Sequence, residues 1–217
     1  MMYSTCDFSK LDSIGVICRG ASISKISKVS DRFEACFLVG QFENSLTKIG
    51  KYLRNKHIVQ VINKCAIQTD RKVCERYRIR DIQCNFGSYF GEELSEGKTA
   101  LFKKIRKKNP WAEVHLVPDG LAARRPMDKW ETTGIYAVDL ACFLKPKEIH
   151  VIGLDFYESD YFAKEKLHAG IKANRARGQA MREQFMKLVD RDKDIHFNVV
   201  THSRHLKSGD NLSVRVI

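Results

Sequence analysis

Residues 131–161 read ETTGIYAVDLACFLKPKEIHVIGLDFYESDY and combine a turn, an apolar helix, a strand and an acidic, aromatic loop. Thr132, Thr133 and Gly134 predict the helix entrance, because a threonine hydroxyl caps free N–H groups and glycine allows a ligand to approach closely. Residues 135–144 are almost entirely apolar, which indicates a helix buried against a sheet. Residues 148–152 predict a strand, so residues 153–157 follow its carboxyl end, where α/β sheets carry their chemistry.

The rest of the chain alternates between strand and helix patterns. Strands are expected at residues 13–18, 33–39, 57–62, 80–84, 112–117, 195–200 and 212–217. Helices are expected at residues 43–53, 65–78, 99–108 and 179–189. Residues 87–97 predict a loop, and the basic segment at about 158–178 predicts a mobile lid. The alternation favours one Rossmann-like α/β domain over residues 1–217, with a mainly parallel sheet covered by helices on both faces.

Composition and charge narrow the class of partner. An apolar content of 43% and an aromatic content of 10% over 217 residues are globular values. The net charge of +12 predicts an anionic partner, which can be nucleic acid, an anionic membrane or a phosphorylated small molecule. The charge is uneven: residues 101–130 hold eight Lys and Arg against three acids, and residues 161–193 hold nine against four.

The cysteines and the apolar runs point to a reducing compartment. Seven scattered cysteines without a CxxC pair indicate reduced core thiols. The first ten residues lack the pattern of a signal peptide, and no apolar run reaches the length that spans a bilayer. The sequence therefore predicts a cytoplasmic protein, with peripheral contact at the inner membrane face as a further hypothesis. His202 and His205 have no ligand partner at metal spacing, so no metal site is expected.

The first predicted strand ends at a glycine turn. Arg19, Gly20 and Ser22 lie between this strand and a hydroxyl-rich helix start. N–H groups at a helix N-terminus favour an anion, and serine adds a donor, so the turn could hold a phosphate. An ordinary strand-to-helix turn explains a single glycine equally well.

Residues 132–157 resemble the core of the bacterial sialyltransferases of glycosyltransferase family 42. Those enzymes have a Thr-Ser-Gly turn, an apolar helix, a Lys-Glu-Ile strand and a Gly-Ile-Asp-Phe-Tyr loop in the same order and spacing. Residues 16–23, VICRGASI, are similar to the nucleotide loop of that family, and residues 33–42, FEACFLVGQF, to its second strand.

The resemblance implies a modified GT-A-type fold that moves sialic acid, or a related sugar acid, from a CMP-activated donor to a glycan hydroxyl without a metal or another cofactor. It implies an oligosaccharide or glycolipid acceptor, such as lipooligosaccharide. His168 matches the base, and Tyr157 and Tyr161 match tyrosines that help CMP to depart. The implied donor contacts are Gly20, Ser22, Gln41, Phe42, Thr132, Thr133, Gly134 and Asp155. Asp155 also suits a structural role, in which it fixes its loop by accepting backbone N–H bonds.

Two positions depart from the family pattern. Arg19 stands where the nucleotide loop has an asparagine, and Gly40 stands where the second strand has another. Arg19 could pair with a phosphate as a charge-assisted donor. A transferase that has lost its activity and binds an anionic glycan or membrane is one alternative. A basic nucleic-acid-binding module is the other, supported by residues 103–108 but lacking interleaved aromatics. A homo-oligomer is compatible with all three hypotheses.

Overall fold

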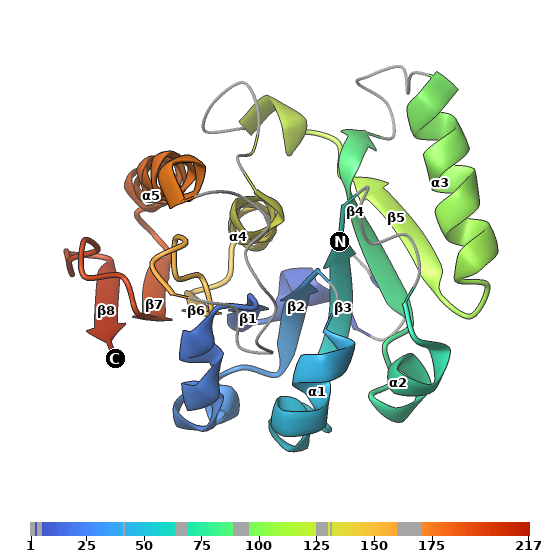
Figure 1. Ribbon diagram of the computed structural model, residues 1–217, viewed down its shortest axis with the longest axis horizontal. Helices are drawn as coiled ribbons and strands as arrows, with labels where there is room; N and C mark the ends of the chain where they lie inside the picture. The colour runs from blue at the N-terminus through green and yellow to red at the C-terminus, as the bar shows by residue number, and fades with distance from the viewer. Residues whose placement is uncertain are drawn as a thin grey trace.

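The computed structural model describes residues 3, 6–40, 42–63, 69–88, 96–124, 130, 132–159 and 171–217. Within them, eight parallel strands form one sheet in the order β5-β4-β3-β2-β1-β6-β7-β8 (Figure 1). The strands are β1 (Ser13–Ile17), β2 (Ala35–Val39), β3 (His57–Ile62), β4 (Asp81–Ser88), β5 (Glu113–Val117), β6 (Glu148–Ile152), β7 (His196–Thr201) and β8 (Leu212–Val216). The predicted Rossmann-like α/β fold with a parallel sheet is confirmed.

Helices cover both faces of the sheet. In Figure 1, α4 (Thr133–Phe143) and α5 (Ile171–Arg191) lie above it, whereas η2, α1 and α2 lie below. The 3-10 helices are η1 (Phe8–Lys10), η2 (Ala21–Lys28), η3 (Ser30–Arg32), η4 (Gly50–Tyr52) and η5 (Ala122–Arg124). The remaining α-helices are α1 (Glu43–Ile49), α2 (Arg71–Arg76) and α3 (Glu96–Lys108), the last of which buries Ile105 against β4 and β5.

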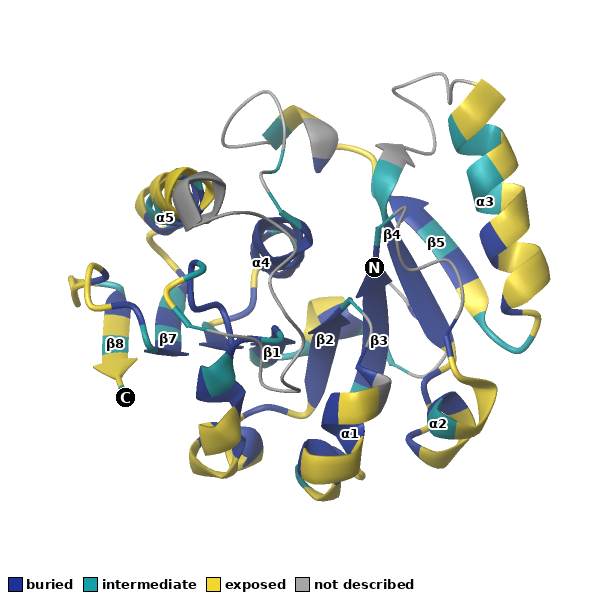
Figure 2. Ribbon diagram, in the orientation of Figure 1, coloured by how far each residue is buried: buried dark blue, intermediate teal, exposed yellow. Residues whose placement is uncertain are grey.

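Helix α4 is the buried helix that its apolar sequence predicts. Residues 133–142 are all buried, in one core with α5 and the strands β1, β2 and β6 (Figure 2). The one charged residue inside it, Asp139, accepts hydrogen bonds from Trp130 Nε1 at 2.7 Å and Arg191 at 2.7 Å. Burial raises the pKa of Asp139, and these donors oppose that rise. The helix ends before Lys145, which adopts φ 53°, and Pro146 follows.

Several predicted boundaries were wrong. Helix α5 begins at Ile171 instead of residue 179, so residues 171–178 of the predicted lid are helical. Gly178 weakens the helical pattern of the sequence, so the first two turns of α5 were not predicted. Glycine is required at this position because a Cβ would meet the Phe156 carbonyl oxygen at 2.1 Å. Strand β4 runs on to Ser88, and α3 begins at Glu96, which shortens the predicted loop from both sides.

The other boundary errors concern short helices. Helix α2 (Arg71–Arg76) begins after its N-cap Asp70 and ends before Tyr77, so it is shorter at both ends than the helix predicted over residues 65–78, of which residues 65–68 lie outside the described residues. The helix predicted at 43–53 is α1 followed by the 3-10 turn η4, and the one after the glycine turn is the 3-10 helix η2. These segments are short, so side-chain packing outweighs their weak intrinsic helix preference.

The predicted core thiols are confirmed among the described residues. Cys18, Cys36, Cys84 and Cys142 are buried and free, and Cys6 is partly buried and free. Cys74 is buried, with its thiol 3.5 Å from Thr69 Oγ1, and Cys65 lies outside the described residues. None of the described helices has the length and apolar character to cross a membrane.

Candidate active site at the carboxyl edge of the sheet

The strand order reverses direction at β1, which lies between β2 and β6. Consecutive strands β1 to β5 extend to one side, and β6 to β8 extend to the other. Open α/β sheets bind their ligands at the carboxyl edge beside such a switch point. The loops that follow β1 and β6 meet there, since Gly20 N donates to Gly153 O at 2.8 Å. A Cβ on Gly20 would lie 2.4 Å from Asp155 Oδ2, so only glycine permits this approach.

Asp155 is the centre of a buried hydrogen-bond network at this edge. It is 4% exposed and accepts from Ser22 N at 3.0 Å and Ser22 Oγ at 2.6 Å. It also accepts from Ser159 Oγ at 2.7 Å, His202 N at 3.0 Å and Thr201 Oγ1 at 3.2 Å. The loops after β1, β6 and β7 are therefore held by one carboxylate. The structural role predicted for Asp155 is confirmed.

This network gives the glycine turn a structural role. Ser22 is fully buried, and its hydroxyl also accepts from Gly153 N at 3.0 Å. The N–H of Ser22, the second residue of η2, thus donates to Asp155, an internal anion, in the position that sequence reasoning offered to a phosphate. Gly20 and Ser22 shape the edge by close packing and internal hydrogen bonds.

The entrance to α4 lies over the same edge. Thr132 is the N-cap, and its Oγ1 accepts from Ile135 N at 3.3 Å, as predicted. A Cβ on Gly134 would meet Leu154 Cδ1 at 2.9 Å and Cys18 Sγ at 3.3 Å, which places the turn on the loops after β1 and β6. Burial raises the pKa of the Cys18 thiol, with a further contribution from Asp155, so this cysteine is a packing group and not a thiolate nucleophile.

Two asparagines that sequence reasoning missed converge on Thr133. Asn63, directly after β3, donates to Thr133 Oγ1 at 3.0 Å, and Asn85, in β4, donates to the same oxygen at 3.1 Å. A hydroxyl that accepts two hydrogen bonds still has its own proton to donate. Ile62 of β3 pairs with Cys84 of β4, so Asn63 and Asn85 follow at the same level of adjacent strands. Polar residues at matching positions of successive parallel strands are a signal that could have identified both.

The two departures from the family pattern, Arg19 and Gly40, lie side by side. A Cβ on Gly40, which has φ 87°, would be 3.3 Å from Arg19 Nε. Any larger residue at position 40 would therefore displace the arginine as well as strain the backbone. Gln60 Nε2 donates to Gly40 O at 2.9 Å and fixes this turn. The missing side chain at position 40 makes room for the guanidinium at the switch point.

The loop that carries Tyr157 is pressed against α5. Phe156 and Tyr157 both have left-handed backbones, with φ 49° and 59°, and Gly178 accepts the close approach of the Phe156 carbonyl. Arg177 lies 5.7 Å from the Tyr157 ring centroid. Consecutive left-handed residues without glycine are strained, which indicates that packing on α5 imposes the orientation of Tyr157.

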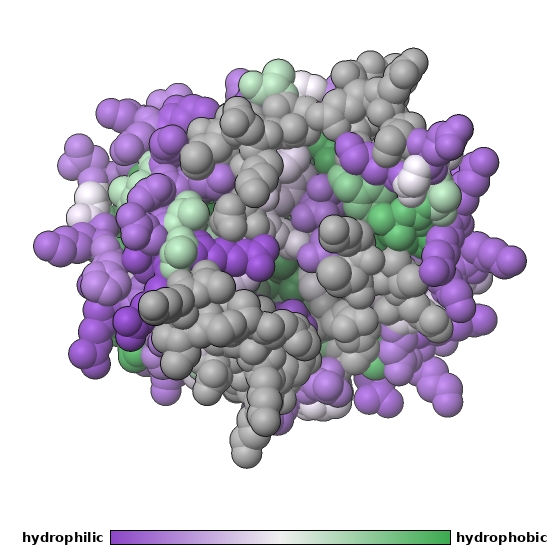
Figure 3. Space-filling view, turned by 45° about the horizontal axis from the view of Figure 1, so that its top comes forward, coloured by the Kyte–Doolittle hydropathy of each residue, from purple (hydrophilic) through white to green (hydrophobic). Residues whose placement is uncertain are grey.

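A polar cavity of about 310 Å³ adjoins the Asp155 network. Its lining is Glu158, Ser159, His202, Arg204 and Ile217. Glu158 pairs with Arg182 of α5 at 2.6 Å and accepts from Ser203 Oγ at 2.7 Å. Figure 3, turned so that the α4 and α5 side comes forward, shows hydrophilic side chains along the left and right sides of the molecule and a hydrophobic patch on the right.

The remaining predicted site residues divide into two groups. The Phe42 side chain is 1% exposed and packs in the core on the α1 side, so it supports the second loop from beneath. His168, Tyr161 and Gln41 lie outside the described residues. The structure thus brings together Arg19, Thr133, Gly134 and the Asp155 loop at one edge of the sheet.

Solved structures with this fold include two sialyltransferases. The alpha-2,3-sialyltransferase Cst-I from Campylobacter jejuni is 17% identical, with a TM-score of 0.55 over 87% of this chain and 75% of that one. The sialyltransferase CST-II, solved with a trisaccharide acceptor and CMP, is 18% identical, with a TM-score of 0.58 over 86% and 80%.

A third match is CstII from Campylobacter jejuni with cytidine-5'-monophosphate, a substrate analogue, at 20% identity and a TM-score of 0.52 over 87% and 79%. The sequence matches no protein-family model and no curated protein. At these identities the likeness establishes a common fold, which is the fold that the sequence resemblance predicted.

Proposed function

We propose that the protein transfers sialic acid, or a related sugar acid, from a CMP-activated donor to a hydroxyl of a glycan. The observation that carries this proposal is the group of donors at the switch point. The Thr132–Gly134 turn begins α4, Asn63 and Asn85 meet at the Thr133 hydroxyl, and Arg19 lies over Gly40. A helix N-terminus, a hydroxyl and a guanidinium suit the phosphate and carboxylate of such a donor. The fold shared with sialyltransferases, two of them solved with CMP, supports the same conclusion.

The chemistry follows from these groups. The acceptor oxygen attacks the anomeric carbon, the bond from that carbon to the phosphate oxygen breaks, and CMP leaves with the electron pair. In this proposal His168 takes the acceptor proton, because histidine titrates near neutral pH. Tyr157 and Tyr161 donate to the departing phosphate, and Arg19 supplies positive charge. These donors supply the charge stabilisation that a metal ion would otherwise give, so we propose a metal-independent reaction.

The acceptor is proposed to be an oligosaccharide or glycolipid that enters beside the cavity lined by Glu158, His202 and Arg204. The exposed Lys and Arg of α3 would hold the protein at an anionic membrane surface. These residues are Lys103, Lys104, Arg106, Lys107 and Lys108.

An inactive, anion-binding relative is the second candidate, and the Arg19 and Gly40 pair favours it. A guanidinium contributes more charge than an asparagine but cannot accept a hydrogen bond. The altered site could therefore retain a nucleotide without orienting its sugar for transfer.

Calorimetric titration with CMP and CMP-sialic acid, against ATP, tests the proposal. We expect selective binding of the cytidine compounds, which Arg19→Ala and Thr133→Val each weaken by about tenfold or more, since a hydrogen bond to a charged group contributes about 1.5–3 kcal/mol. Arg54→Ala and Thr47→Val are matched controls, because both side chains are exposed and neither is among the donors of the proposed site.

The transfer assay uses CMP-sialic acid and a lactose-terminated glycan. Cytidine binding with transfer that His168→Ala abolishes supports the enzyme. Cytidine binding without transfer supports the inactive relative. Equal binding of ATP and CMP would overturn the transferase.

A further inference from the structure

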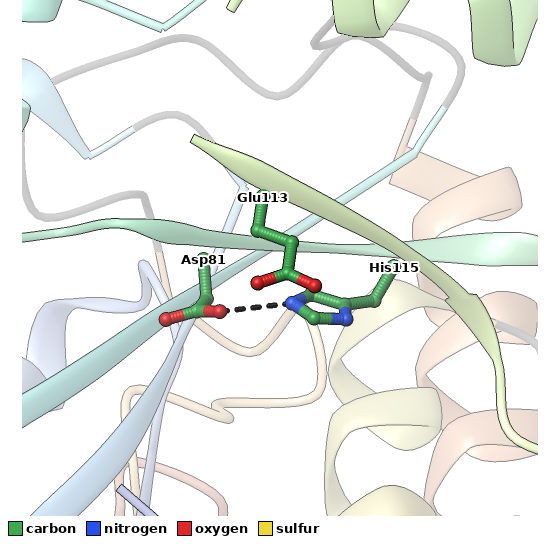
Figure 4. Close-up of side chains that lie close together, drawn as sticks. All are labelled: Asp81, Glu113 and His115. Atoms are coloured by element: carbon green, nitrogen blue, oxygen red, sulfur yellow. Dashed lines mark hydrogen bonds and ion pairs between the residues drawn. The ribbon is translucent and has the colours of Figure 1, made fainter. Parts of the chain in front are cut away.

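A second group of reactive side chains lies at the opposite end of the sheet. Asp81 is the first residue of β4, and Glu113 is the first residue of β5 and its register partner. Paired residues of neighbouring parallel strands share a face, and so do alternate residues of one strand, which adds His115 to the group. The potential ligand atoms of the three side chains all lie within 4.8 Å of one another. Figure 4 shows them turned toward a common point, with His115 Nε2 2.8 Å from Asp81 Oδ1.

This group of three side chains is largely buried, unlike most pairs of charges on a protein surface. The Asp81 side chain is 0% exposed and that of His115 is 12% exposed, whereas Glu113 faces solvent. The group is thus closed beneath and open on the Glu113 side. Among the described residues it is the only set of three His, Cys, Asp or Glu side chains with such close ligand atoms.

The donor types indicate the ligand. Two carboxylates at this separation repel each other, and partial burial strengthens the repulsion. A divalent cation between them removes it, and an imidazole with two carboxylates is a donor set suited to Zn²⁺ or Mn²⁺. Zn²⁺ binds such mixed nitrogen and oxygen sites more tightly than Mn²⁺. We propose that Asp81, Glu113 and His115 bind a Zn²⁺ ion, with its remaining coordination position open to water.

The position of the site assigns it a structural role. Asp81 lies four residues before Asn85, which reaches Thr133 at the candidate active site, so the two sites are roughly 13 Å apart along β4 at about 3.3 Å per residue. The ion would cross-link β4 to β5. Strand β5 is at the edge of the sheet and pairs only with β4, so a metal link there would strengthen its attachment. The Tyr3 ring packs edge-on against His115 at 5.0 Å, so the beginning of the chain would be held as well. This inference is independent of the proposed transferase activity.

The sheet contains a matched control for this site. Glu148 and His150 repeat the Glu-x-His spacing at the start of β6, and their Oε2 and Nε2 atoms are 3.1 Å apart. No third ligand atom lies as close there within the described residues. If spacing alone created a zinc site, both strands would carry one, whereas our proposal requires the additional carboxylate of Asp81.

Calorimetric titration of the chelator-treated full chain with Zn²⁺ tests the proposal, with Mn²⁺ and Mg²⁺ as comparisons. We expect one tight Zn²⁺ per chain, weakened by about tenfold or more in Glu113→Gln and unchanged in Glu148→Gln. Glu113 is exposed, so its amide variant should fold, and equal thermal midpoints of variant and parent in chelator check this. Zn²⁺ should then raise the midpoint of the parent and not that of Glu113→Gln.

Three results would overturn the site. The first is the absence of Zn²⁺ binding to the parent chain. The second is equal affinity in Glu113→Gln, which would mean that the ion binds elsewhere, for example at His202 and His205. The third is tighter binding of Mg²⁺ than of Zn²⁺, which would remove the imidazole from the ligand set.

Discussion

The two ends of the sheet each contain a buried aspartate, and their surroundings differ in kind. Asp155, at the carboxyl edge, is enclosed by N–H and O–H donors from the loops after three strands. Asp81, at the amino edge, has an imidazole and a second carboxylate beside it. A carboxylate enclosed by neutral donors is fully stabilised inside the protein and serves to fix loops. A carboxylate next to another anion gains from a cation. Burial alone does not assign a role to an acid, whereas the charge and donor capacity of its neighbours do.

Asp155→Asn should lower the stability of the protein more than the other substitutions that follow. The amide has one acceptor oxygen and no charge, so several buried donors lose their partner. We expect a loss of about 3 kcal/mol in the free energy of unfolding, measured by urea denaturation. Asp210→Asn is the control, because Asp210 is exposed near the end of the chain. A loss below about 1 kcal/mol in Asp155→Asn would show that the network does not hold the edge together.

A pair of helical glycines tests the attachment of the Tyr157 loop to α5. Gly178→Ala would push a methyl group into the Phe156 carbonyl, and we expect a loss of about 1–3 kcal/mol. Gly97→Ala, in α3, has nothing within 4 Å of the new Cβ and should raise stability by about 0.5–1 kcal/mol. Urea denaturation of both variants gives the two signs. If Gly178→Ala were also stabilising, the loop and the helix would not be in the described contact.

The smallest expected effect is on the pH dependence of stability, and it comes from His150. Burial lowers its pKa below the ordinary 6.5, and Glu148 opposes this only in part. The unfolded chain therefore binds a proton more readily than the folded one, so stability falls as pH drops below 6.5. We expect His150→Phe to remove up to about 1 kcal/mol of this acid-induced loss between pH 6.5 and pH 5. His205→Gln, an exposed control, should keep the full pH dependence, and an unchanged slope in His150→Phe would contradict the assignment.

Sequence reasoning identified most strands and α4 because their patterns are long and apolar, which only a buried sheet and helix can satisfy. It was wrong about the start of α5, where the glycine that weakens the helical pattern is required by a contact with Phe156. It also found Asp155 and the Thr132–Gly134 turn, whose residue types have few other uses after a strand. It missed Asn63 and Asn85: their places on successive strands can be read from the sequence, but their common partner, Thr133, is set only by folding.

The parallel α/β fold, the buried α4 and the edge of the sheet that holds the candidate site all follow from the order of residues along the chain. Periodicity and turn residues are local properties, so they can be recognised in the sequence without the structure. Three features come from folding: Asp155 binds the glycine turn, Arg19 fills the space beside Gly40, and Asp81 meets Glu113 and His115. Each of these is a contact between residues far apart in the sequence or on different strands, set by strand order and register, which no local pattern encodes.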